Sequence, residues 1–74
     1  MTPQEMARVY VQSIELEELT GATAPELTDK VGELRSNLHA LLMEVLREHH
    51  VPFVDRFDAS RLAYQLVRET TPAA

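Results

Sequence analysis

The chain of 74 residues contains no cysteine, no tryptophan, two glycines and four aromatic residues. The absence of cysteine excludes disulfide bonds and every thiolate metal site. A domain of this length buries only a modest core, and it commonly needs a disulfide, a structural metal or a partner chain to be stable. Because the disulfides are excluded, we expect the chain to associate with itself or to dock on another protein.

Long hydrophobic runs are also missing. The longest apolar run covers residues 40–43, which is far too short to span a bilayer. The first ten residues lack the basic-then-apolar layout of a signal peptide. The hydrophobic fraction of 45% is nevertheless that of a folded domain. These features predict a soluble, folded, cytoplasmic protein.

Charge is unevenly distributed along the chain, which has a net charge of −5. Residues 1–46 carry three basic and eight acidic side chains, whereas residues 47–74 carry four of each. An acidic protein repels phosphate backbones, so the composition disfavours nucleic-acid binding. Only the neutral C-terminal third could approach DNA without an electrostatic cost.

Good helix formers dominate the composition and predict an all-α fold. We expect one small helical domain over residues 1–74, with helices at about 3–19, 24–50 and 59–69 and a frayed tail at 70–74. The first helix should begin with a capping box formed by Thr2 and Glu5 around Pro3, and Gly21 could close it in a left-handed conformation. A strand through "RVYVQSIEL" is the alternative, because β-branched residues cluster there.

A regular aliphatic stripe is the most informative pattern in the chain. Its members follow one another at spacings of 4, 3, 4, 3 and 4, which is the heptad seam of a coiled coil. The stripe consists of Leu27, Val31, Leu34, Leu38, Leu41 and Val45. It predicts one long central helix in a helical hairpin, closed by a short C-terminal helix. Such a helix outreaches the rest of the chain, so we expect a helix-bundle homodimer with the stripe as its seam. The alternative is that the chain's own helices cover the stripe.

Charges beside the stripe bear on how two copies would pair. Lys30, Asn37 and Glu44 flank the stripe at intervals of seven residues. In a parallel dimer Lys30 would face Arg35 of the other chain, which is a like-charge contact. An antiparallel pair centred near Asn37 instead brings Lys30 close to Glu44 of the other chain. The flanking charges therefore favour the antiparallel arrangement.

The segment "REHHVPFVDRF" at residues 47–57 combines two adjacent histidines, a proline and two phenylalanines. Adjacent side chains on a helix point about 100° apart, so His49 and His50 are poorly placed to share a metal ion. We interpret the segment as a corner between two helices, with a pH-sensitive interface as an alternative. We expect no metal site and no cofactor.

A partner-binding surface is predicted from the aromatic and basic residues near the C-terminus. Such residues are enriched at binding hot spots. The candidates are Phe53, Arg56, Phe57, Arg61 and Tyr64. The alternative is that the aromatic rings form a wedge in the core, which their helical spacing favours, because apolar side chains at such spacing are usually core. The acidic cluster Glu15, Glu17 and Glu18 is a second candidate surface.

Catalytic motifs are not recognisable, since the chain has no phosphate-binding glycine loop and no nucleophile elbow. We therefore expect a non-enzymatic interaction protein, such as an adaptor, a regulator or a phage- or plasmid-type inhibitor, that binds another protein. The alternative is a dimeric DNA-binding regulator that uses its last helix. In that case the base-reading face would carry Ser60, Arg61, Tyr64, Gln65 and Arg68.

Overall fold

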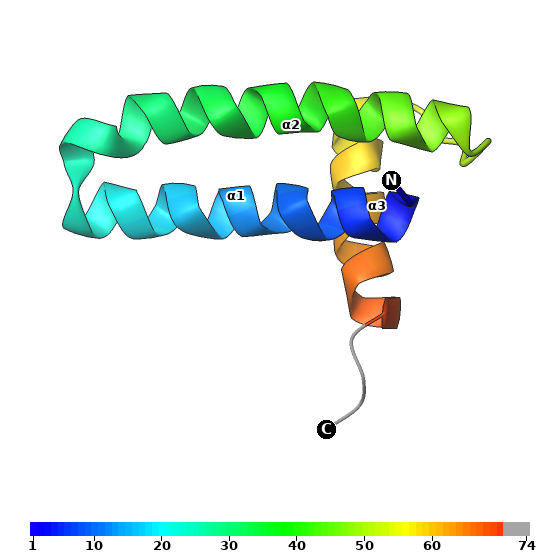
Figure 1. The fold of residues 1–74 in the computed structure, drawn as a ribbon, viewed down its shortest axis with the longest axis horizontal. Helices are drawn as coiled ribbons and strands as arrows, with labels where there is room; N and C mark the ends of the chain where they lie inside the picture. The colour runs from blue at the N-terminus through cyan, green and yellow to red at the C-terminus, as the bar shows by residue number, and fades with distance from the viewer. Residues whose placement is uncertain (71–74) are drawn as a thin grey trace.

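A computed structural model describes residues 1–70, which form three α-helices and no strand. The helices are α1 (Pro3–Thr23), α2 (Thr28–Glu48) and α3 (Arg56–Thr70), and a short 3-10 turn, η1 (Pro25–Leu27), joins the first two. The predicted all-α class is confirmed. In Figure 1, α1 and α2 lie side by side and antiparallel, and α3 crosses behind them where α1 begins and α2 ends. Within residues 1–70 no helix is long and apolar enough to cross a membrane.

Helix α1 begins with the predicted capping box. The Glu5 backbone N–H donates to the Thr2 hydroxyl at 3.1 Å, and the Thr2 backbone N–H donates to the Glu5 carboxylate at 3.0 Å. The helix includes the residues for which a strand was the alternative, and it continues past residue 19 to Thr23. The prediction that Gly21 takes a left-handed conformation is wrong, because no glycine has a positive φ. The helix instead ends where the Ala24 N–H donates to the Thr20 carbonyl.

The connection between α1 and α2 differs from the predicted helix start at residue 24. Thr23 belongs to α1, and its hydroxyl donates to the Leu19 carbonyl at 2.8 Å rather than capping the next helix. Pro25 disfavours the helical region for the residue before it, and Ala24 accordingly has φ −147° and ψ 69°. As a result α2 has 21 residues, as α1 does. The prediction of one dominant helix over residues 24–50 is therefore wrong.

The segment with two histidines forms the corner between α2 and α3. Helix α2 ends at Glu48, and His50 is left-handed with φ 57°. The Val51 N–H donates to the Leu46 carbonyl at 2.8 Å, which is the closing bond of a Schellman motif. Helix α3 begins at Arg56, three residues before the predicted start, because the Asp55 side chain accepts the Asp58 N–H at 2.9 Å.

The hydrophobic core lies at the end of the α1–α2 pair that α3 crosses. Leu42 and Leu46 on α2 are fully buried, and two alanines on α3, Ala59 and Ala63, let that helix approach closely. The core is completed by Met6, Ala7, Tyr10 and Val11 from α1. Among residues 1–69, Pro3 at the start of α1 is the one other apolar residue that is buried. The core thus joins all three helices at one end of the molecule.

The heptad stripe is split between two environments. Val31, Leu38 and Val45 are half-buried, and the last two pack against the core. The remaining members are exposed, with 45% of Leu27, 46% of Leu34 and 47% of Leu41 accessible to solvent. One row of the stripe is therefore covered within the chain, and the other row lies on the surface.

Candidate functional site

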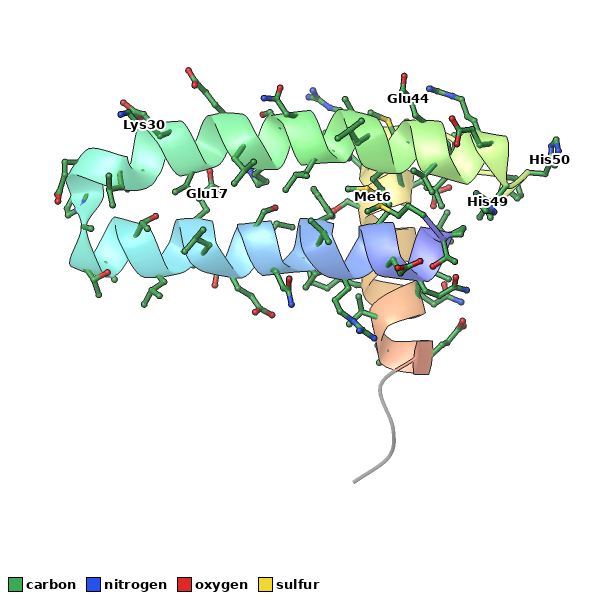
Figure 2. The ribbon with its side chains drawn as sticks, in the orientation of Figure 1. Met6, Glu17, Lys30, Glu44, His49 and His50 are labelled. Carbon is green, nitrogen blue, oxygen red and sulfur yellow. The ribbon has the colours of Figure 1, made fainter. Side chains whose placement is uncertain are left out.

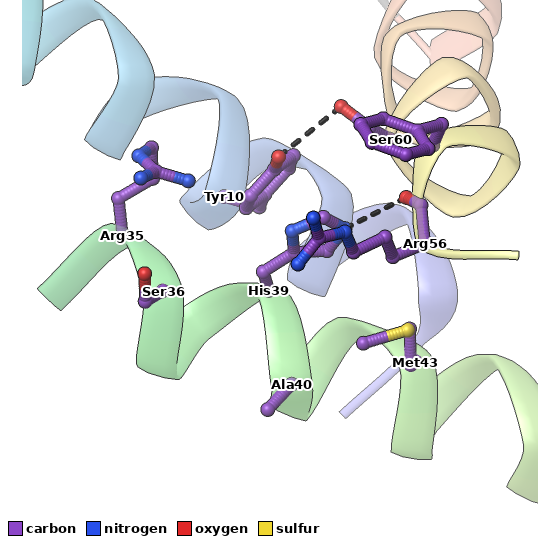
Figure 3. Close-up of a pocket in the computed structure, with 9 residues that line it drawn as sticks. Tyr10, Arg35, Ser36, His39, Ala40, Met43, Arg56 and Ser60 are labelled. Atoms are coloured by element: carbon purple, nitrogen blue, oxygen red, sulfur yellow. Dashed lines mark hydrogen bonds between the residues drawn. The ribbon is translucent and has the colours of Figure 1, made fainter. Parts of the chain in front are cut away.

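A pocket of about 430 Å³ lies where the three helices meet (Figure 3). Helix α1 contributes Tyr10, α2 contributes five residues, and α3 contributes the rest. The lining residues are Tyr10, Arg35, Ser36, His39, Ala40, Met43, Arg56, Phe57 and Ser60. Because residues of all three helices line it, the pocket exists only when α3 is docked on the α1–α2 pair.

Two hydrogen bonds fix the walls of this pocket. The Tyr10 and Ser60 hydroxyls are 3.1 Å apart and join α1 to α3. The His39 imidazole donates from Nε2 to the Arg56 carbonyl at 2.8 Å and so joins α2 to the start of α3. The His39 ring also lies 4.9 Å from the Tyr10 ring, centroid to centroid. Figure 3 shows both bonds as dashed lines. These contacts join α3 to both α1 and α2 at the pocket wall.

Basic side chains line the pocket, although the chain is negative as a whole. Arg35 and Arg56 both line it, and no acidic residue does. Arg35 binds the Glu17 carboxylate at 2.9 Å, which explains why an acidic residue occurs on the otherwise apolar face of α1. The Arg56 guanidinium lies 5.0 Å from the Phe57 ring centroid, a cation–π contact. An arginine stacked on an aromatic ring therefore forms part of the rim.

Two of the predicted partner-binding residues, Arg56 and Phe57, come together at this pocket. Phe57 is 70% exposed. Phe53 does not share its surface, because it packs half-buried against the core, under the Arg47 guanidinium at 5.2 Å. Phe53 therefore packs in the way that the alternative, an aromatic wedge in the core, predicts, whereas Phe57 lies on the surface.

The other two predicted residues lie elsewhere on α3. The Arg61 guanidinium binds the Asp58 carboxylate at 2.7 Å. Arg61 lines a separate shallow pocket together with Gln65, Arg68 and Glu69. Tyr64 is 42% exposed, and burial raises the pKa of its hydroxyl, with smaller contributions from Tyr10, Glu18 and Glu15. Tyr64 does not line the pocket.

Sequence reasoning did not identify His39, Arg35 or Tyr10 as site residues. The spacing of Arg35, His39 and Met43 at four-residue intervals places them on one face of α2, next to the aliphatic stripe. The shared face could have been recognised from the sequence. Its role as a pocket wall could not, because that role depends on where α3 docks, and residue spacing within α2 does not predict the position of α3.

Metal-binding geometry is not found in the part of the chain that the structure describes, where no three histidine or acidic side chains are grouped suitably. His49 and His50 are exposed, and the His49 Nε2 donates to the Met1 carbonyl at 3.1 Å. Figure 2 shows both at the end of α2, with His50 pointing away from the α1–α2 pair. Comparison with known protein families, curated proteins and solved structures found no match for this chain.

Proposed function

We propose that the protein is a non-enzymatic interaction module that binds another protein at the pocket between the three helices and acts as a homodimer. The observation that supports this most directly is Phe57, a large apolar side chain that is 70% exposed at the pocket rim. Phenylalanine and arginine are both enriched at protein–protein interfaces.

The chemistry of the pocket suggests what the partner presents there. Arg35 and Arg56 supply guanidinium donors, Ser36 supplies a hydroxyl, and the lining holds no carboxylate. Guanidinium groups bind carboxylates through paired hydrogen bonds. A partner segment that places an acidic side chain in the pocket and an apolar side chain on Phe57 would satisfy both features.

Selection of random peptides displayed on phage tests this proposal. Peptides enriched on the wild-type protein should carry an acidic residue close to an apolar one. The variants Arg56→Glu and Phe57→Ser should lose these peptides, whereas Val54→Ser should retain them, because Val54 is 89% exposed but does not line the pocket. Enriched peptides that bind Arg56→Glu and Phe57→Ser as well as wild type would refute the proposed site.

A DNA-binding regulator is the competing class, since Arg61, Gln65 and Arg68 lie along the exposed face of α3. Against it, Asp58 binds Arg61, and the Gln65 side chain donates to Glu69 at 3.1 Å. Binding to a DNA duplex at 50 mM salt, with an affinity that falls linearly on a log–log plot against salt, would favour the regulator. We expect no measurable binding.

A further inference from the structure

Five exposed aliphatic side chains form a surface that the pocket does not use. Val9 and Leu16 on α1 are 36% and 41% exposed. Leu34 and Leu41 on α2 are 46% and 47% exposed, and Leu27 at the end of η1 is 45% exposed. We call this surface the open face: Val9, Leu16, Leu27, Leu34 and Leu41. An isolated exposed leucine is ordinary, but a row at seven-residue intervals on two neighbouring helices is a continuous apolar stripe.

The open face lies on the side of the α1–α2 pair opposite to α3. On α1, Tyr10 points toward α3, where it bonds Ser60. At 100° per residue, Val9 and Leu16 point 100–120° away from Tyr10 in the same rotational sense. On α2, His39 points toward α3, and Leu34 and Leu41 point 140–160° away from it. Figure 1 shows α3 on one side of the pair only.

Contacts between α1 and α2 establish which residues lie level with each other. Three contacts do so: His49 with Met1, His39 with Tyr10, and Arg35 with Glu17. In each, the two residue numbers add up to about 50. Val9 therefore lies level with Leu41, and Leu16 lies level with Leu34. The open face thus consists of two apolar layers seven residues apart, with Leu27 beyond the second.

We propose that the open face is covered by a second copy of this chain, packed antiparallel about a two-fold axis that passes Asn37. This rests on the homodimer in the proposed function and names its interface and register. In that register Leu34 meets Leu41 of the second copy, and Leu16 meets Val9 of the second copy. The midpoint between Leu34 and Leu41 lies level with the midpoint between Val9 and Leu16. A single two-fold axis therefore generates both pairs of contacts, as an isologous interface requires. The axis also passes the middle of each 21-residue helix, so the helices overlap along their full length.

Charge complementarity supports the same register. Lys30 and Glu44 lie seven residues on either side of Asn37, and both are exposed. Figure 2 shows both pointing away from α1. Neither takes part in an ion pair within residues 1–70. The two-fold axis places Lys30 opposite Glu44 of the second copy twice, and such pairs fix register and orientation. The pockets then lie on the two outer sides of the dimer, where each could bind a separate partner.

Sedimentation equilibrium of the full chain tests the interface. The wild type should show a mass of twice 8.4 kDa at high concentration and dissociate on dilution. Leu34→Asp should be monomeric yet fully helical by circular dichroism, because Leu34 is already half exposed. Val54→Asp is the matched control and should dimerise as wild type, since Val54 lies in the corner before α3. A wild-type monomer up to about 1 mM, or a dimeric Leu34→Asp, would overturn the proposal.

Cysteine cross-linking tests the register, which is simple in a chain without cysteine. Asn37→Cys should form a disulfide-linked dimer on mild oxidation, because the axis places residue 37 beside its own copy. Lys30→Cys should not, since the two copies of residue 30 would be about 21 Å apart at 1.5 Å per residue. Equal cross-linking of both variants, or none for Asn37→Cys, contradicts the register.

Charge reversal adds a test that does not depend on oxidation. Lys30→Glu and Glu44→Lys should each weaken the dimer about tenfold, and the double variant should recover wild-type affinity. Within one chain the two residues are about 21 Å apart along α2, so recovery requires contact between chains. Failure of the double variant to recover refutes the pairing. The Leu34→Asp monomer should still bind the peptides selected on the pocket, so loss of the dimer and loss of the partner site are separable results.

Discussion

The two ends of the α1–α2 pair are built differently although the two helices run their full length together. At the end that α3 crosses, Leu42 and Leu46 are fully buried and Tyr10 bonds Ser60. At the end beside η1, the buried groups are polar. Thr20 donates to its own helix, and the buried Thr28 hydroxyl has no partner among the described residues. The first end is a core, whereas the second is a pair of helices that face solvent on both sides.

This difference shows that amphipathic patterning alone does not decide what is buried in so short a chain. Leu34 and Leu38 belong to the same stripe, yet only Leu38 packs against the core. A third helix of 15 residues covers one side of one end, and the chain has no further element to cover the rest. The surface that stays uncovered is the one on which we propose that a second copy packs.

Truncation of matched leucines should separate the two ends most strongly. Leu42→Ala should destabilise the protein by about 2–5 kcal/mol, because it leaves a cavity among fully buried side chains. Leu34→Ala should cost less than about 1 kcal/mol in dilute protein, where its side chain is half exposed. Urea denaturation at low micromolar concentration measures both. Equal losses would mean that the two ends do not differ as described.

The two glycines should respond differently to alanine. Gly21→Ala should stabilise the protein by up to about 1 kcal/mol, because a Cβ there has no neighbour within 4 Å and alanine favours the helix. At Gly32 the added Cβ would lie 2.9 Å from the Glu17 carboxylate, which binds Arg35. Gly32→Ala should therefore gain less. Thermal unfolding of both variants checks this, and a larger gain at Gly32 would contradict the Glu17 contact.

Glycine at position 50, in the corner between α2 and α3, should stabilise the protein. His50 has φ 57°, a conformation that costs most side chains about 1 kcal/mol and costs glycine little. His50→Gly should therefore stabilise the protein by about 0.5–1 kcal/mol in urea denaturation. His49→Gly is the control and should destabilise it, since His49 has negative φ and bonds the Met1 carbonyl. Destabilisation by His50→Gly would show that its side chain has a role of its own.

Acid should destabilise the first turns of α1 and α3, which both lie at the end of the molecule that α3 crosses. The Thr2 backbone N–H lowers the pKa of Glu5, and the Val54 N–H followed by Arg61 lowers the pKa of Asp58. A carboxyl whose pKa is lower in the folded state stabilises the fold above its unfolded pKa, and this contribution is lost as pH falls through the folded value. Stability should thus fall below about pH 4.5. Glu5→Gln should reduce this pH dependence, and an unchanged profile would contradict the assignment.

The sequence predicted the elements better than their arrangement. The capping box at Thr2 and the all-α class could be predicted because they depend only on residues that are close together in the sequence. The end of α1 and the start of α2 were misplaced, because Gly21 accepts helical geometry and Pro25 supports a 3-10 turn. Arg56 and Phe57, which were predicted from composition, both line the candidate pocket. His39 and Tyr10 were missed, since the docking of α3 brings them there.

Hydrogen exchange at two protein concentrations tests the central claim most directly. If a second copy covers the open face, amide protection in residues 16–34 should rise between about 10 μM and 1 mM protein. Protection in residues 42–46, which belong to the core of each chain, should rise much less. Equal protection of residues 16–34 at both concentrations would contradict the account.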